Sequence, residues 1–144
     1  KNMFDRCIPA LLPFMELDES GEVRHTPRYL KGGKKIVLLS TCGFPEPATF
    51  IPLVSHVERI ARNMHACLVG RVLRPQGMIL PYQQFLGSRY IRVVSALQQA
   101  GREFVTHGYI TPHTEAEIAR PFMPTEQFLG AANTFWKKEV ERAG

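Results

Sequence analysis

The sequence has only three cysteines, Cys7, Cys42 and Cys67, and they lie far apart. An odd number without paired spacing is not the pattern of a disulfide framework. No C-x-x-C pair is present to hold zinc or an iron–sulfur cluster, and the five histidines also lack metal-ligand spacing. We therefore expect reduced thiols, with Cys7 and Cys67 filling the core, and we predict no metal site.

The sequence also lacks any apolar run long enough to span a membrane, and it has no signal-peptide pattern. These absences predict a cytoplasmic protein without a membrane partner. Eighteen Lys and Arg against 13 Asp and Glu give a net charge of +5. The basic residues are scattered rather than massed, so we do not expect nucleic-acid binding, although the charge suits an anionic ligand such as a phosphate or nucleotide.

Motifs for catalysis are absent as well. The chain has neither a G-x-x-x-x-G-K-[ST] loop nor a G-x-G-x-x-G loop, and its carboxylates form no recognisable acid–base pair. Cys42 invites comparison with cysteine phosphatases, but Ala48 stands where their arginine would be. A Cys42–His56 nucleophile is conceivable, yet no orienting acid accompanies it. The sequence therefore assigns no catalytic residue.

What the sequence does have is a short apolar run between glycines, at residues 34–45. Two lysines lead into residues 36–39, which are all apolar, and the run ends in Ser40, Thr41, Cys42 and Gly43. The flanking glycines and prolines favour a strand over a helix. Because its apolar residues do not alternate with polar ones, we expect both faces to be covered, as in a parallel sheet flanked by helices.

The segments around this strand predict further elements. Residues 1–14 resemble a helix with an apolar stripe that Pro9 and Pro13 terminate. The turn signal at residues 18–21 predicts a small hairpin, since apolar residues flank it. A helix should begin at Thr49 as its cap, with an apolar stripe in the i, i+3, i+4 pattern, and residues 66–73 should form the next strand. Strand, helix and strand at this spacing predict a βαβ crossover between parallel neighbours.

The remainder of the chain is predicted to be largely helical. A loop over residues 74–87 should lie beside the Thr41 loop, because both leave the carboxyl ends of neighbouring strands. A long helix over residues 89–108 should end at Gly108. Its apolar side is expected to comprise Tyr90, Val94, Leu97, Gly101, Phe104 and Val105.

Two shorter predictions complete the chain. A capping box at Thr114 predicts a short helix to about Arg120. A final helix should begin at Thr125 as its cap and carry Trp136, the only tryptophan, whose ring should be buried against the domain or a partner.

In a parallel sheet, ligands bind beyond the carboxyl ends of the strands, which places the candidate site at Ser40, Thr41, Cys42, Gly43 and Phe44. Backbone N–H groups and small side chains there suit an anion or the polar edge of a planar heterocycle. The alternative is that this segment is only a tight strand-to-helix turn.

The order of three segments carries a family resemblance. Residues 4–9 (FDRCIP), residues 33–43 (GKKIVLLSTCG), and the helix and strand that follow resemble the flavodoxin-like NAD(P)H-dependent FMN reductases, in the multimeric flavodoxin and iron–sulfur flavoprotein branch. The resemblance extends to about Gly108 and covers only the carboxyl-terminal half of that fold. The family's first strand and phosphate loop, and the clustered cysteines of the iron–sulfur branch, have no counterpart here.

The resemblance implies a fold and a function. The fold is α/β: a partial flavodoxin-like parallel sheet flanked by helices, with a helical carboxyl-terminal tail, in one domain over residues 1–144. Residues 40–44 would approach the isoalloxazine ring of FMN, which takes electrons from NAD(P)H and passes them to a small-molecule acceptor. Phe44 would either stack near the ring or plug the head of the following helix.

Two further expectations follow from the missing half. Without the contacts to the FMN phosphate, the chain should bind FMN weakly and be nearly inactive. Unpaired sheet edges imply either a lost upstream half or a homo-oligomer, in particular a dimer. The alternative function is a non-catalytic flavodoxin-like oligomerisation or binding module.

Overall fold

A computed structural model describes residues 6–29 and 33–144 of the chain, and the fold is mixed α/β. A hairpin of β1 (Leu11–Leu17) and β2 (Val23–Pro27) follows the 3-10 turn η1 (Ile8–Ala10). The central unit is β3 (Lys34–Thr41), η2 (Pro47–Phe50), α2 (Ile51–Asn63) and β4 (Ala66–Arg74). Then come η3 (Gly77–Ile79), α3 (Gln83–Leu86), α4 (Ser88–His107), α5 (Pro112–Ala119) and α6 (Thr125–Ala143).

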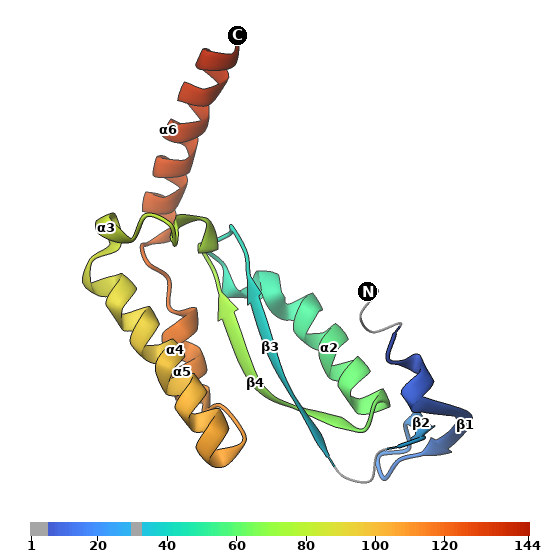
Figure 1. Cartoon of the computed structure of the whole chain (residues 1–144). Helices are drawn as coiled ribbons and strands as arrows, with labels where there is room; N and C mark the ends of the chain where they lie inside the picture. Colours follow the sequence, from blue (N-terminus) through green and yellow to red (C-terminus); the bar gives the residue numbers. More distant parts are fainter. Residues whose placement is uncertain (1–5, 30–32) are drawn as a thin grey trace.

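The central sheet consists of two parallel strands, β3 and β4, connected through α2. Their register runs from Lys34 opposite Ala66 to Thr41 opposite Arg74. The predicted strands and the βαβ crossover are therefore confirmed. In Figure 1, α2 lies on one side of the two strands, and α4 and α5 lie on the other.

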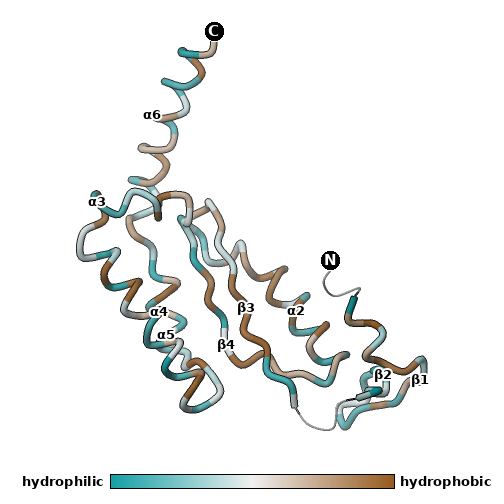
Figure 2. Tube along the Cα trace, viewed as in Figure 1, coloured by the Kyte–Doolittle hydropathy of each residue, from teal (hydrophilic) through white to brown (hydrophobic). Residues whose placement is uncertain are grey.

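The prediction that β3 is covered on both faces is wrong at its carboxyl end. The middle of the strand is its hydrophobic part (Figure 2), and residues 36–38 are half-buried. Leu39, however, is 69% exposed. The reason is that β4 is the only strand paired with β3 in the described parts of the chain, so β3 forms an edge.

The helix α2 packs on the sheet through apolar residues of the predicted i, i+3, i+4 stripe. Val57 and Ala61 are buried, as is Phe50 just before the helix. Pro52 lies in the first turn, where the missing N–H has no intrahelical partner to lose. Thr49 does not cap the helix, because the 3-10 turn η2 takes up that position and Phe50 is the N-cap residue.

The long helix α4 has the predicted length, with Gly108 as its left-handed C-cap residue, but it packs through a different face. Its buried residues are Val93, Ala96, Ala100 and Glu103. Of the side predicted to be buried, Leu97 is 41% exposed and Val105 is 85% exposed. The two alanines allow a close approach of α4 to Ile110 and Ile118, against which Val37 and Val72 of the sheet also pack.

The amino-terminal region confirms one prediction and corrects another. The hairpin β1–β2 is antiparallel, and its turn is held by the Asp18 carboxylate, which accepts from the backbone N–H groups of Ser20 (2.9 Å) and Glu22 (3.0 Å). The predicted helix over residues 1–14 is wrong for the described part: residues 8–10 form η1 and the chain then enters β1. Pairing with β2 outweighs the helical pattern there. Residues 1–5 lie outside the described residues.

The N-cap residue of the short helix α5 (Pro112–Ala119) lies three residues before the predicted cap, Thr114. Thr111 is the N-cap residue, and its hydroxyl accepts from the backbone N–H of Thr114 (3.3 Å). Thr114 lies inside the helix, and its hydroxyl donates to the Glu103 carboxylate (2.7 Å). That long-range partner makes Thr114 a buried anchor rather than a cap. The predicted end before Pro121 is confirmed, since Arg120 is the C-cap residue.

The last helix, α6, projects away from the sheet (Figure 1). Phe128 near its start is buried, but Trp136 is 56% exposed and packs edge-to-face with Phe135 at 5.2 Å between ring centroids. Burial of the tryptophan against the domain is therefore wrong for this chain. Thr125 is the first helical residue rather than the cap, which is Pro124.

Cys67 is exposed on β4, so it does not fill the core. In residues 6–29 and 33–144, no helix is both long and apolar enough to cross a bilayer.

We predict that Glu103 links acid stability to the packing of α5 on α4. Its carboxylate accepts from the Thr111 backbone N–H (2.8 Å) and the Thr114 hydroxyl, and these bonds lower its pKa from the ordinary 4.5 to about 2. Because the folded-state pKa is the lower one, the stabilisation is complete above about pH 4.5 and is lost as the pH falls toward 2. Thermal unfolding between pH 7 and pH 2 measures this dependence.

Glu103→Gln should destabilise the chain most above pH 4.5, and the difference from the wild type should shrink between pH 4.5 and pH 2. Glu141→Gln, on the exposed end of α6, is the matched control and should show no such dependence. A constant difference between the wild type and Glu103→Gln over this pH range would contradict the prediction.

Candidate functional site

The carboxyl ends of β3 and β4 are joined by a set of backbone hydrogen bonds. The Cys42 N–H donates to Arg74 O (3.1 Å), the Gly77 N–H donates to Cys42 O (2.7 Å), and the Gln76 N–H donates to Phe44 O (3.0 Å). The Thr41 hydroxyl also donates to Arg74 O (3.0 Å). The predicted neighbourhood of the Thr41 loop and the loop after β4 is thus confirmed, and the two form one rigid rim.

The predicted site residues all lie on this rim. Ser40 and Cys42 are half-buried, Thr41 and Gly43 are exposed, and the Phe44 ring is 65% exposed. Phe44 therefore does not plug the head of α2, and that alternative is wrong.

In the same loop, some backbone groups of residues 42–44 form hydrogen bonds with described residues and others do not. The carbonyls of Cys42 and Phe44 accept hydrogen bonds from the turn after β4. Among the residues with described positions, no acceptor is found for the backbone N–H groups of Gly43 and Phe44. Two consecutive donors thus remain for a ligand next to an exposed aromatic ring.

Gln76 holds the rim to the segment between α5 and α6. Its side chain is fully buried, with 0% exposed. Its carbonyl oxygen accepts from the Phe122 N–H (2.7 Å) and the Met123 N–H (3.3 Å), and its amide donates to Met123 O (2.9 Å). Sequence reasoning assigned Gln76 only to a loop. A glutamine two residues after a strand end gives no signal of these distant partners.

Arg74, the last residue of β4, is a second site residue that sequence reasoning missed. It is 5% exposed, and its Nη1 donates to Ile118 O (2.5 Å) and Arg120 O (2.7 Å). Its guanidinium lies 3.9 Å from the centroid of the Phe122 ring. Burial, and then the nearby charge of Arg92, lower the pKa of Arg74 from 12.5 to about 10. A charged residue at the very end of a buried parallel strand was the available signal.

An open hollow of about 310 Å³ lies beside the rim. Ser40, Thr41 and Arg74 supply its polar lining, and the rest is apolar: Leu39, Val72, Leu80, Val93, Leu97 and Ile118. A hollow with an apolar wall and a few polar groups at one end is the usual form of a small-molecule site.

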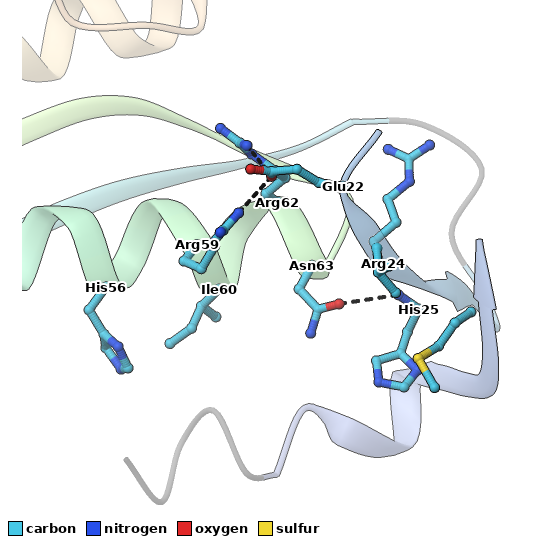
Figure 3. A pocket seen from close by; sticks show the side chains of 10 residues that line it. Glu22, Arg24, His25, His56, Arg59, Ile60, Arg62 and Asn63 are labelled. Carbon is cyan, nitrogen blue, oxygen red and sulfur yellow. Dashed lines mark hydrogen bonds and ion pairs between the residues drawn. The ribbon is translucent and has the colours of Figure 1, made fainter. Parts of the chain in front are cut away.

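A larger hollow, of about 580 Å³, lies between the hairpin and α2 (Figure 3). Its charged groups are already paired within the chain: Glu22 forms ion pairs with Arg59 (2.6 Å) and Arg62. The Asn63 side-chain oxygen accepts from the His25 backbone N–H (3.1 Å). These contacts attach the hairpin to α2, so the hollow is explained by packing between the two elements.

The structure does not pair Cys42 with His56 as a thiol nucleophile would require. His56 lines the hairpin hollow, at the opposite end from His25 (Figure 3). The Cys42 thiol instead donates to Phe44 O (3.4 Å). As far as the described residues extend, no three His, Cys, Asp or Glu side chains gather as metal ligands.

Comparison with known proteins gives no relative: no protein-family model, no curated protein and no solved structure matches this chain. Its function is therefore argued from the geometry above.

We predict that the contact between Gly77 and Thr41 holds the rim together. A Cβ on Gly77 would overlap the Thr41 hydroxyl oxygen and lie 3.0 Å from Thr41 Cβ. Gly77→Ala should therefore displace Thr41, break its bond to Arg74 O, and lower the free energy of unfolding by about 1–3 kcal/mol in urea titrations.

The matched control is Gly43→Ala, since a Cβ there meets only Met78 Sδ at 3.7 Å, an ordinary contact. It should change stability by less than about 0.5 kcal/mol. Thr41→Ala should partly rescue Gly77→Ala, because it removes the overlapping hydroxyl. Equal stability of the two glycine variants would refute the prediction.

Proposed function

We propose that this chain is part of an FMN-dependent NAD(P)H oxidoreductase, in which residues 40–44 contact the isoalloxazine ring. The observation that carries the proposal is the pair of N–H groups at Gly43 and Phe44, which have no acceptor in residues 6–29 and 33–144 and lie next to the exposed Phe44 ring. They lie at the carboxyl end of a parallel strand, where open α/β sheets bind their ligands.

The chemistry of the ring fits this arrangement. The pyrimidine edge and N5 of a flavin accept hydrogen bonds, and the ring is planar and aromatic. Two adjacent backbone donors would bind its acceptors, and Phe44 would stack against it. The flavin would supply the hydride and electron transfer, and the loop would hold its position and tune its potential. The flavodoxin-like assignment of the βαβ unit is part of this proposal.

Flavin titration tests the proposal. FMN and riboflavin, which has the same ring without the phosphate, should both lose fluorescence when this chain is added. Phe44→Ala should weaken both interactions about three- to tenfold, which corresponds to the loss of one aromatic stacking contact.

Phe14→Ala is the matched control, because Phe14 is similarly exposed (69%, against 65% for Phe44) but lies on the hairpin. It should leave the flavin affinity unchanged. Absence of quenching by both flavins, or equal affinities of Phe44→Ala and the wild type, would rule out a ring site at this loop.

A second candidate function is that of a non-catalytic oligomerisation module. It is favoured by the edge strand β3, whose Leu39 is exposed beside an apolar hollow of about 370 Å³ that Val37, Leu97 and Phe104 also line. A second copy could pair with this edge and fill the hollow.

Sedimentation velocity distinguishes the two candidates. A module should sediment as a dimer and show no flavin affinity. Leu39→Lys should then convert it to a monomer, since it places a charge in the apolar contact, whereas Val23→Lys on the exposed hairpin should not. A wild-type monomer at all concentrations would contradict this alternative.

A further inference from the structure

Two arginines, Arg74 at the end of β4 and Arg92 on α4, each leave the same edge of the guanidinium group without a partner among the described residues. The Nε and Nη2 atoms of both Arg74 and Arg92 are buried, and no acceptor for them is present among the described residues. In an arginine these two nitrogens form the side-on fork that binds carboxylates and phosphates with two parallel hydrogen bonds. Among the described residues, four donor atoms of one kind are therefore left unsatisfied.

Such an arrangement is unfavourable without an anion. A buried donor without an acceptor costs free energy, and a buried charge without a counter-charge costs more. Arg74 is 5% exposed, and the positive charge of Arg92 acts on it from α4. In the described parts of the chain, neither Arg74 nor Arg92 forms an ion pair with a carboxylate. Glu117, the acidic residue closest to the end of α5, is already paired with Arg120.

The surrounding contacts fix the position of Arg74. Its Nη1 is used by Ile118 O and Arg120 O, and its plane lies over the Phe122 ring. Arg89, three residues before Arg92 on α4, donates from its Nη1 to Phe122 O (3.0 Å) and adds a third positive charge. The unused edge of Arg74 is thus held in place by the protein.

We propose that Arg74 and Arg92 bind a phosphate group, either of free phosphate or of a phosphate monoester. A carboxylate has two oxygens, which one fork satisfies, whereas a phosphate presents three or four oxygens to two forks. Its charge near −2 at neutral pH also matches two guanidinium groups. Arg74, but not Arg92, lines the hollow of about 310 Å³ together with Ser40 and Thr41, and the ligand would approach Arg74 from this side.

This site is independent of the proposed flavin contact. It uses side chains of β4 and α4, whereas the flavin contact uses the backbone and the ring at Gly43 and Phe44. A chain that binds no flavin would still bind phosphate, and the reverse also holds.

Isothermal titration of the full 144-residue chain with inorganic phosphate, at constant ionic strength, tests the proposal. We expect one bound phosphate per chain. Arg92→Gln should weaken binding about tenfold or more, because it removes charge-assisted hydrogen bonds. Arg102→Gln is the matched control on the same helix. Arg102 is exposed, and among the described residues its side chain bonds only to Gln99 (3.2 Å), so its loss should change the affinity less than twofold.

Three further measurements sharpen the result. Arg92→Lys, which keeps the charge but loses the fork, should weaken binding nearly as much as Arg92→Gln, and circular dichroism verifies that both variants fold. Methyl phosphate that binds as tightly as inorganic phosphate indicates the terminal group of a larger ligand, and tighter binding of the free ion indicates phosphate itself. The proposal is overturned if phosphate does not bind, if acetate binds equally well, or if Arg92→Gln and Arg102→Gln have the same affinity.

Discussion

The buried side chain of Gln76 is the interaction on which the site region depends. Gln76 lies two residues after the end of β4 and has a left-handed backbone conformation (φ 54°). Its backbone N–H donates to Phe44 O, and its side chain bonds to residues 122–123. One residue thereby connects the loop after β3, the turn after β4 and the segment that leads into α6. Since all polar atoms of its amide group are buried, each hydrogen bond must be kept for the rim to retain its shape.

That constraint explains why the functional groups lie where they do. The carbonyls of Cys42 and Phe44 accept from the turn after β4, whereas the N–H groups of Gly43 and Phe44 have no acceptor in the part of the chain that the structure describes. With Phe122 positioned by Gln76, the ring lies under the guanidinium of Arg74. Backbone donors and buried cations therefore occur at the same end of a two-stranded sheet, and both are complementary to ligands that carry acceptors or negative charge.

The sequence predicted the βαβ unit because its signals are local. The apolar run at residues 36–39, the stripe of α2 and the Gly108 C-cap each depend on neighbours within a few residues. It misjudged α4 because large apolar residues were assumed to mark the buried face. The alanines at 96 and 100 mark it instead, since small side chains allow the close approach of the helix.

The errors at Thr114, Arg74 and Gln76 have distant partners as their cause. Thr114 has the pattern of a cap, but the carboxylate of Glu103, eleven residues away, makes it a buried anchor. Arg74 and Gln76 appeared to be ordinary loop-boundary residues, and only the return of the chain at residues 118–123 gives them their roles. Residues 40–44 could be singled out from the strand pattern alone. For Arg74 that pattern gave only its place at the strand end, and for Arg92 it gave no signal.

The exposed tryptophan on α6 has a practical consequence. Trp136 is the only indole of the chain, and it lies on a helix that extends from the body of the molecule. The tryptophan fluorescence of the protein therefore reports the surroundings of that one helix and is little affected by changes in the sheet. A shift of this emission to shorter wavelength would reveal a neighbouring molecule on α6, even when the rest of the fold is unchanged.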